Sequence, residues 1–293
     1  LVVEPWLANC ALAGPLLASQ ASAPQIELVT AMVSGDRQLA LAAHERQGRY
    51  DGFDVKTRAI PAGDGWRLDG AKTLVLNGAN AQTLLVLARE SGGQRDTAGL
   101  SLFLVGADCP GLTVRGLPTY DGRQTAELEL REVAVTAQAR VGEAGLAWAA
   151  VEAAIDRATV MLCAEAVGAM DRALTMTRDY LRTRKQFGKA ITDNQVIRHR
   201  LVDMMVAIEQ SRAITEAAAH GLDSDARGRR RAVSLAKAFV SGAGRRVGED
   251  AVQLHGAIGM TDEYEVGQCY KRLAAAANLF GDAEWHGARL AEG

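Results

Sequence analysis

Apolar positions change their spacing along this chain and divide it into three parts. Residues 1–36 place apolar side chains at helical steps between spaced prolines, which predicts short helices and the remnant of an N-terminal helical domain that is largely missing. Between residues 37 and 141, short apolar runs such as 84–88 and 100–105 are separated by turn dipeptides. These dipeptides end in glycine: Asp64-Gly65, Asp69-Gly70, Asn77-Gly78, Pro110-Gly111 and Asp121-Gly122. Many short strands joined by tight turns predict an antiparallel β-barrel or sandwich.

Helical spacing takes over after residue 142. Apolar side chains recur at steps of three or four, beginning with Val151, Ile155, Ala158 and Leu162. Four helices are predicted, at about 143–183, 193–222, 229–254 and 262–291, and this number suits a four-helix bundle. We therefore expect an α+β multidomain fold whose parts are a partial N-terminal helical domain at 1–36, a middle β domain at 37–141 and a C-terminal bundle at 142–293.

Composition and charge exclude several classes of protein. Of the 293 residues, 48% are hydrophobic and 23% are charged, which is ordinary for a folded protein and excludes a disordered one. Lys and Arg number 33 against 35 Asp and Glu, so no net positive charge favours nucleic-acid binding. The four cysteines lie far apart without metal-binding spacing, and no stretch has the pattern of a membrane span or an export signal. We expect reduced thiols, no bound metal and a cytoplasmic location.

The first candidate site begins with the sequence RKQFG at residues 184–188 and is followed by Gln195. Arg184 and Phe187 are three residues apart, so on a helical turn they would share a face and offer a guanidinium group for phosphate beside an aromatic surface. A helix end with an exposed arginine and a buried phenylalanine would show the same pattern. The residues alone leave both interpretations open.

Three further candidate segments contain glycine. At 253–259 the helical pattern stops in glycines, where a ligand could approach the backbone or a helix could simply end. At 280–286, Glu284 stands among large aromatic residues, an environment that raises a carboxyl pKa toward that of a base, although a surface glutamate would be commoner. The glycines of 242–248 resemble a dinucleotide-binding loop, but no strand precedes them, so we interpret them as sites of close helix packing.

Taken in order, these segments resemble the acyl-CoA dehydrogenase family over essentially the whole chain. That family has a helical domain, a β-barrel domain and a four-helix C-terminal domain, with FAD between barrel and bundle and each FAD shared by two subunits. The resemblance implies FAD as cofactor, an acyl-CoA substrate and a homo- or hetero-oligomer, dimeric or tetrameric. Residues 280–286 are similar to those of a bacterial subgroup that includes the small subunit of pimeloyl-CoA dehydrogenase.

The resemblance also assigns cofactor-binding roles. The matching positions are Arg184, Phe187, Gln195, Gln253, Gly256, Ala257, His44, Leu76 and His286. Arg184 and Phe187 match the pair that meets the FAD of the neighbouring subunit. His44 stands where the family's flavin loop has a threonine, and Leu76 replaces a flavin-contacting side chain, so the flavin loop departs from the family pattern.

Two carboxylates match positions of catalytic bases in the family. Glu284 matches the glutamate that removes the α-proton of the acyl thioester, and Asp156 matches an alternative position on the first helix of the C-terminal domain. Arg157, directly after Asp156, is the implied substrate contact. The choice between the two bases stays open.

The implied activity is FAD-dependent α,β-dehydrogenation of an acyl-CoA to the trans-2-enoyl-CoA, as in the β-oxidation of fatty acids. A carboxylate takes the α-proton, the flavin accepts the hydride, and an electron-transfer flavoprotein takes the electrons. The alternative, suggested by the altered flavin loop around His44 and Leu76, is a non-catalytic subunit that completes the FAD or substrate site of a heteromeric enzyme.

Overall fold

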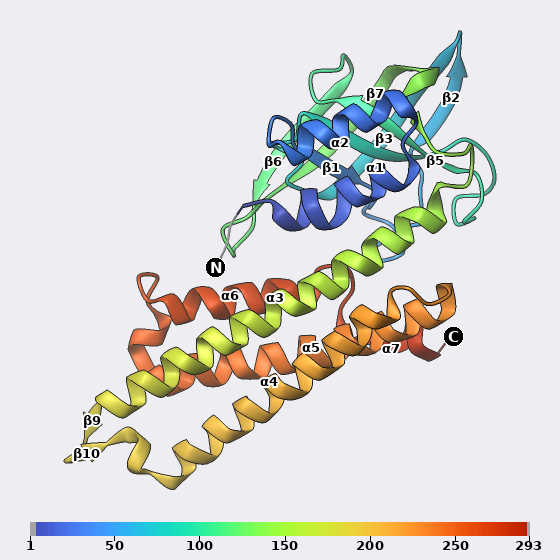
Figure 1. Ribbon diagram of the computed structural model, residues 1–293. Helices are drawn as coiled ribbons and strands as arrows, with labels where there is room; N and C mark the ends of the chain where they lie inside the picture. The colour runs from blue at the N-terminus through green and yellow to red at the C-terminus, as the bar shows by residue number, and fades with distance from the viewer. Residues whose placement is uncertain (1–3, 292–293) are drawn as a thin grey trace. The chain divides into compact units, whose positions relative to one another are not determined.

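The computed structural model describes residues 4–291 (Figure 1). Contacts between residues divide the chain into two compact units, one ending at Ala158 and the other beginning at Thr159. The division falls inside one long helix, residues 147–183. Each unit is described below by itself.

The first unit begins with short helices, as the spacing predicts. They are the π-helix η1 (Leu7–Ala13), α1 (Gly14–Gln20), the 3-10 turn η2 (Ala23–Gln25) and α2 (Ile26–Val33). Leu12, Leu16 and Leu17 are buried, so this short segment has an apolar face packed in the unit's interior. Asn9 accepts a hydrogen bond from the backbone of Leu39 at 2.6 Å, which ties the helices to the first strand.

An eight-stranded sheet forms the rest of this unit. Its strands are β1 (Leu39–Ala42), β2 (Arg58–Ala62), β3 (Gly65–Leu76), β4 (Thr83–Arg89), β5 (Leu100–Gly106), β6 (Leu112–Pro118), β7 (Gln124–Thr136) and, after the turn η3 (Ala137–Ala139), β8 (Arg140–Val141). The strand order is β6-β7-β3-β2-β4-β5-β8, and β1 pairs with β4. Most pairings are antiparallel as predicted, but β1 runs parallel to β4, and so does β2.

Strand β4 explains the continuous apolar run that the sequence shows there. All of its residues are buried, whereas the residues of β6 are exposed or partly so. A strand covered on both faces needs no alternation of polar and apolar side chains. Leu84, Val86 and Phe103 accordingly belong to one apolar cluster with residues of β3 and β7.

The second unit is the helical bundle. It contains α3 (Ala147–Thr183, of which residues 159 onward belong here), β9 (Lys185–Gln186), β10 (Lys189–Ala190), η4 (Ile191–Asp193), α4 (Gln195–Gly221), α5 (Ala226–His255), η5 (Gly256–Met260), α6 (Glu265–Asn278) and α7 (Ala283–Ala291). One core cluster joins α3, α4, α5 and α6, including Met170, Met204, Val240 and Leu273. In Figure 1 these helices run side by side, as a bundle requires.

The glycines of 242–248 lie inside α5 and not in a loop. A Cβ at Gly244 would lie 3.2 Å from Leu273, and one at Gly248 would lie 3.0 Å from Tyr270. Their small size therefore lets α6 approach α5, which confirms the packing interpretation. Within the described residues, no helix is both long and apolar enough to cross a membrane.

The prediction of one continuous helix at 262–291 is wrong. The helical path breaks between α6 and α7, where Phe280 has φ of 61° and Gly281 has φ of 111°. Asp282 then begins α7 by accepting a hydrogen bond from the backbone of Trp285 at 2.8 Å. The apolar spacing continues through the break, so hydrophobic pattern alone did not locate it.

Candidate cofactor and substrate site

The RKQFG segment forms a β-hairpin. Helix α3 ends at Thr183, and β9 and β10 pair across a turn in which Phe187 and Gly188 have φ of 52° and 81°. Left-handed backbone at both positions closes the turn, so the expected helical face shared by Arg184 and Phe187 is wrong. Phe187 is 99% exposed at the hairpin tip. Phe187 thus offers a flat aromatic surface at the tip of the hairpin.

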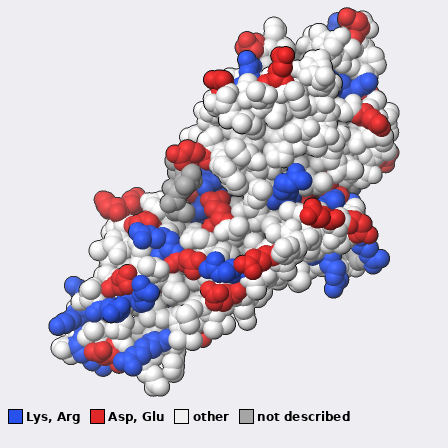
Figure 2. Space-filling model, in the orientation of Figure 1, with Lys and Arg blue, Asp and Glu red and all other residues white. Residues whose placement is uncertain are grey.

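The charge around this hairpin is strongly positive. Residues 182–200 contain one carboxylate, Asp193, and six cationic side chains, Arg182, Arg184, Lys185, Lys189, Arg198 and Arg200, all of them exposed. Figure 2 shows Lys and Arg gathered at the end of the bundle that carries β9 and β10. Gln195 is also exposed there, as the first residue of α4. This end of the bundle suits an anionic ligand.

The end of α5 carries the second predicted segment. Gly256 ends the helix with φ of 67°, and Gln253, Gly256 and Ala257 are all exposed. Beside them, His255 is buried and stacks on Tyr180 with a centroid distance of 4.7 Å. Burial lowers the pKa of His255, although a bond between its Nδ1 and the carbonyl of Ala251 opposes this shift.

The second ring nitrogen of His255 is unusual. Its Nε2 is buried and has no hydrogen-bond partner in the part of the chain that the structure describes. Buried polar atoms in native proteins are nearly always paired, so an orphaned one marks a place where a bound group can complete the set. The neighbouring exposed backbone of Gly256 and Ala257 leaves room for such a group.

The flavin-loop residues lie in the first unit, around a buried ion pair. Lys72 on β3 donates to Glu45 at 2.7 Å, and both side chains are almost fully buried. Glu45 also accepts from the backbone of Lys56 and from the backbone and hydroxyl of Thr57. Burial alone would raise the pKa of Glu45, but the charge of Lys72 and the hydrogen bonds lower it to about 2. The carboxylate is therefore ionised at neutral pH.

His44 stands next to this pair. Burial, together with the charge of Lys72, lowers the pKa of His44 to about 4, so its ring is neutral at pH 7. Its Nδ1 is buried and has no hydrogen-bond partner among the described residues, whereas the Nδ1 atoms of the buried His255 and His286 each have one. A neutral imidazole with one free nitrogen can serve a ligand as donor or as acceptor.

The strand that would touch the flavin has an irregular backbone. The register of β3 against β7 shifts between Lys72 and Val75, and Leu74 within this shift has φ of 51° and is 59% exposed. Leu76 is partly exposed. Neither leucine side chain can form a hydrogen bond, so this strand offers only backbone polar groups and apolar surface.

The two candidate bases have opposite surroundings. Glu284 lies in the first turn of α7 and is exposed, so the expected burial among aromatic rings is not what the structure shows. The neighbouring Trp285 instead packs against His286 and Arg289. Asp156 is only 1% exposed and lies on α3, with Arg157 partly exposed beside it.

His286, which the resemblance assigns to the cofactor, lies buried in the bundle. It is 1% exposed, and its two ring nitrogens lie 3.1 Å from the hydroxyl of Ser234 and from the carbonyl of Phe280. Both nitrogens are thus engaged inside the bundle. Sequence reasoning could not see this, because the partners come from α5 and from the turn before α7.

Sequence reasoning also missed two buried lysines, Lys72 and Lys237. Each stands alone in an apolar stretch, at 71–76 and at 233–240. A single lysine on an otherwise apolar face was the available signal, since lysine is almost never fully buried unless it has partners.

Comparisons with known proteins agree with the two-unit architecture. The family profile described as "Acyl-CoA dehydrogenase, middle domain" matches residues 40–133, and the profile "Acyl-CoA dehydrogenase, C-terminal domain" matches residues 145–293.

Individual relatives agree with the profiles. The probable acyl-CoA dehydrogenase FadE25 of Mycobacterium tuberculosis is 30% identical over 82% of this chain, which spans 62% of that relative's length. The caffeyl-CoA reductase-Etf complex subunit CarC of Acetobacterium woodii is 27% identical, and the match covers 90% of this chain and 70% of the length of CarC. The crystal structure of a putative acyl-CoA dehydrogenase from Mycobacterium smegmatis superposes with a TM-score of 0.92 and 28% identity, covering 97% of this chain and 75% of that one. This chain belongs to the acyl-CoA dehydrogenase family.

Proposed function

We propose that the protein carries out FAD-dependent α,β-dehydrogenation of an acyl-CoA thioester. The observation that carries the proposal is the β9–β10 hairpin, which presents a fully exposed Phe187 among cationic side chains in a chain that matches both family domains. FAD would complement both features of this surface. Its anionic pyrophosphate would meet the cationic side chains, and its flat adenine ring would meet Phe187.

The residues fit FAD on each unit separately. On the bundle, we assign the pyrophosphate to Arg184, the adenine to Phe187, and the adenosine half to the exposed backbone of Gly256 and Ala257 with Gln253. Gln195 adds a polar side chain near the hairpin. The unpaired Nε2 of His255 supports this assignment, because a bound polar group would complete its hydrogen bonding.

On the β unit, we assign contacts with the flavin half to His44 and the β3 segment that ends at Leu76. The free Nδ1 of the neutral His44 replaces the hydroxyl of a threonine as a hydrogen-bonding group. The register of β3 against β7 shifts between Lys72 and Val75. Within this shift, the N–H of Thr73 donates to the carbonyl of His44 at 2.9 Å, which joins the two segments that we assign to the flavin.

In the proposed mechanism, Glu284 removes the α-proton of the thioester. Its position in the first turn of α7 leaves the carboxylate accessible, and a bound acyl chain would exclude water from it and raise its basicity. FAD, when bound, supplies the hydride acceptor. Asp156, which is buried on α3, is the rival base, and Arg157 would then meet the acyl-CoA.

The first experiment is a visible absorption spectrum before and after anaerobic addition of a panel of acyl-CoAs. We expect a yellow protein that bleaches with at least one substrate, because proton and hydride removal together reduce the bound flavin. A protein that stays colourless after reconstitution with FAD would contradict the proposal.

Two conservative variants then separate the candidate bases. Glu284→Gln should retain FAD and lose about 10²–10⁴-fold in the rate of bleaching, because a general base typically contributes that much to the rate. Asp156→Asn serves as the matched comparison. Bleaching that survives Glu284→Gln and fails in Asp156→Asn would assign the base to Asp156.

A second candidate function is supported by one observation, the apolar flavin strand. Leu74 and Leu76 offer the flavin no side-chain hydrogen bond, so the chain is also suited to completing the FAD or acyl site of a second, catalytic subunit. Purification alone and with co-expressed candidate partners distinguishes the two. An active homo-oligomer would exclude the subunit role.

For the electron acceptor, we propose an electron-transfer flavoprotein. The support is the relative CarC, whose name places it in a complex with Etf. Reduced protein mixed with such a flavoprotein should transfer its electrons faster than it reacts with oxygen, and peroxide formation at an equal rate would point to an oxidase instead.

A further inference from the structure

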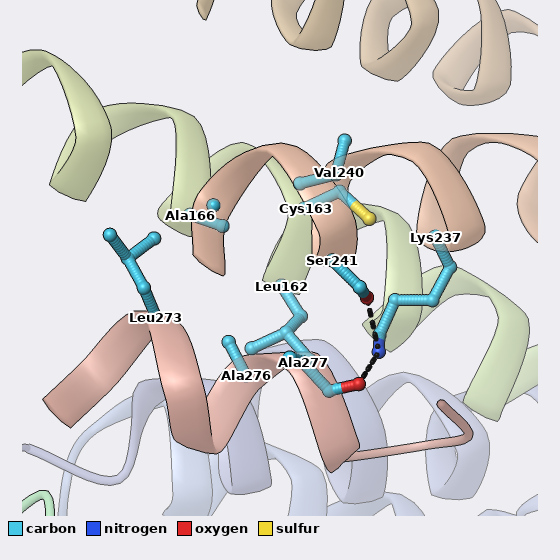
Figure 3. A pocket seen from close by; sticks show the side chains of 10 residues that line it. Leu162, Cys163, Ala166, Lys237, Val240, Ser241, Leu273, Ala276 and Ala277 are labelled. Atoms are coloured by element: carbon cyan, nitrogen blue, oxygen red, sulfur yellow. Dashed lines mark hydrogen bonds between the residues drawn. The ribbon is translucent and has the colours of Figure 1, made fainter. Parts of the chain in front are cut away.

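One face of α5 carries a row of polar side chains into the bundle. Ser234, Lys237 and Ser241 occupy positions i, i+3 and i+7, so they lie along the same side of the helix, and all three are buried. Figure 3 shows Lys237 reaching from α5 toward the end of α6 in a small pocket. The rest of the lining is mostly apolar: Leu162, Cys163, Ala166, Val240, Gly244, Leu273, Ala276 and Ala277.

Lys237 uses all three of its donors on neutral oxygens. Its Nζ donates to the hydroxyl of Ser241 at 3.1 Å, to the carbonyl of Ala277 at 3.0 Å and to the carbonyl of Gly281 at 2.7 Å. Ala277 lies in the last turn of α6, where carbonyls lack helical partners, and Gly281 lies in the turn that follows. One ammonium group therefore bridges the end of α6 and the turn before α7.

His286 completes the arrangement from the opposite side. A carbonyl oxygen can only accept, so the bond between Nε2 and the carbonyl of Phe280 places the proton on Nε2. Nδ1 then accepts from the hydroxyl of Ser234. Burial, with the charges of Lys237 and Arg289, lowers the pKa of His286 to about 3, so the ring holds this neutral form at pH 7.

The turn that these two residues hold is strained. Phe280 is a non-glycine residue in the left-handed region, and Gly281 has φ of 111° with the rings of Trp285 and His286 packed against it. Such conformations persist only where the surroundings determine them. Here the carbonyls of Ala277, Phe280 and Gly281 are all fixed by buried donors.

Packing alone does not account for a lysine at this position. A buried ammonium loses its hydration, and burial lowers the pKa of Lys237 to about 8. Within the described residues, no carboxylate oxygen lies within ion-pair distance of it, and Cys163 stays a neutral thiol because burial raises its pKa to about 12. An apolar side chain of similar volume would be easier to bury. The ammonium is thus retained for the geometry that it imposes.

We propose that Lys237 and His286 are positioning residues for the dehydrogenation. They hold the turn at 279–282 in one conformation and thereby orient the first turn of α7, which carries Glu284. This inference rests on the proposed function and adds to it two residues that are expected to act without touching the substrate.

The test compares Lys237→Met with the surface control Lys271→Met, whose side chain pairs with Asp262 outside the pocket. We expect Lys237→Met to bind FAD and to reach half-maximal bleaching at the same acyl-CoA concentration as the wild type. Its rate of bleaching at saturating acyl-CoA should fall at least tenfold. Its hydrogen exchange across 279–286 should be faster than in the wild type. A rate within twofold of that of Lys271→Met would overturn the proposal.

A second pair of variants covers a failure of Lys237→Met to fold. His286→Gln keeps one donor for the carbonyl of Phe280 and one acceptor for Ser234, whereas His286→Leu keeps neither. We expect the Gln variant to retain most of the bleaching rate and the Leu variant to lose at least tenfold. Equal rates in the two variants would overturn the proposal.

Hydrogen exchange separates this inference from the proposed function. If the wild type holds FAD but no acyl-CoA bleaches it, the proposed function fails, while exchange across 279–286 still reports whether the two residues hold the turn. Unchanged exchange in both Lys237→Met and His286→Leu would overturn the positioning role even in an active enzyme.

Discussion

Lys72 in the β unit and Lys237 in the bundle are both buried and both have a pKa lowered to about 8, yet their partners differ. Lys72 faces the carboxylate of Glu45. This carboxylate accepts five hydrogen bonds, from Lys72, the side chain of Gln47, the backbone of Lys56, and the backbone and hydroxyl of Thr57. Lys237 donates hydrogen bonds only to carbonyl and hydroxyl oxygens, and the charge of Asp282 acts on it without a hydrogen bond. The first arrangement joins a loop to a strand through opposite charges, whereas the second fixes the path of a turn.

The comparison shows that two buried lysines with similarly lowered pKa values can have different kinds of partner. Removing one member of a buried ion pair leaves the other charge uncompensated, which is strongly destabilising. Removing a cation from neutral acceptors leaves unpaired carbonyls but also relieves the burial of a charge. The β unit should therefore respond to substitution mainly in stability, and the bundle mainly in the geometry of its turn.

The largest expected effect is that of Glu45→Gln. It leaves the ammonium of Lys72 buried without an anion, and we expect a loss of about 3–5 kcal/mol in the free energy of unfolding, measured by urea denaturation. Glu27→Gln, at an exposed position of α2, is the control and should change stability by less than about 0.5 kcal/mol. A loss under 1 kcal/mol for Glu45→Gln would show that the pair is not what holds the loop.

Acid should act on the same carboxylate. The pKa of Glu45 is about 2 in the fold against 4.5 for the free side chain, so its contribution to stability is complete above pH 4.5 and is lost as the pH falls toward 2. Unfolding free energies measured across this range should fall less steeply in Glu45→Gln than in the wild type. Parallel curves would contradict the low pKa.

Replacing each lysine by methionine should lower the free energy of unfolding by different amounts in the two units. Lys72→Met leaves Glu45 buried but still bonded to Thr57 and the backbone of Lys56, so we expect a loss of about 1–3 kcal/mol. Lys237→Met should cost about 1 kcal/mol or less, because relief of the buried charge offsets the unpaired carbonyls. Lys56→Met, whose side chain is exposed, controls for the loss of a lysine. The reverse order of the two losses would break the comparison.

Alkaline pH should act alike on Lys72 and Lys237 and should not distinguish them. Each folded lysine releases its proton near pH 8, while in the unfolded chain it holds the proton to about 10.5. The unfolding free energy contributed by each should therefore rise between these values. Either methionine variant should show a shallower rise than the wild type, and an unchanged slope in both would show that the folded lysines keep the ordinary pKa of about 10.5.

The fold was largely predictable, because spacing of apolar positions reports burial directly. The strands, the short N-terminal helices and the long helices of the bundle follow from it, and the fold class is confirmed. The break before α7 was not predictable, since Phe280 and Leu279 continue the apolar pattern while the backbone leaves the helix. Gly188 divides two helices as predicted, but the left-handed turn at Phe187 and Gly188 removes the helical face that the spacing of Arg184 and Phe187 suggested.

The site was less accessible to sequence reasoning. The cofactor positions came from the family resemblance and not from their own chemistry, and they stay predictions. Lys237 and His286 act through backbone carbonyls, which carry no side-chain signature. Interactions of that kind become visible only when the turn that supplies the carbonyls is seen.

The parallel pairing of β1 with β4 has a consequence for synthesis of the chain. Leu39 pairs with Thr83, which the ribosome adds 44 residues later. At about 5–20 residues per second, β1 waits roughly 2–9 s for its partner strand. During that interval a fully apolar four-residue segment is exposed without its sheet, so β1 is where we expect a chaperone to bind the nascent chain.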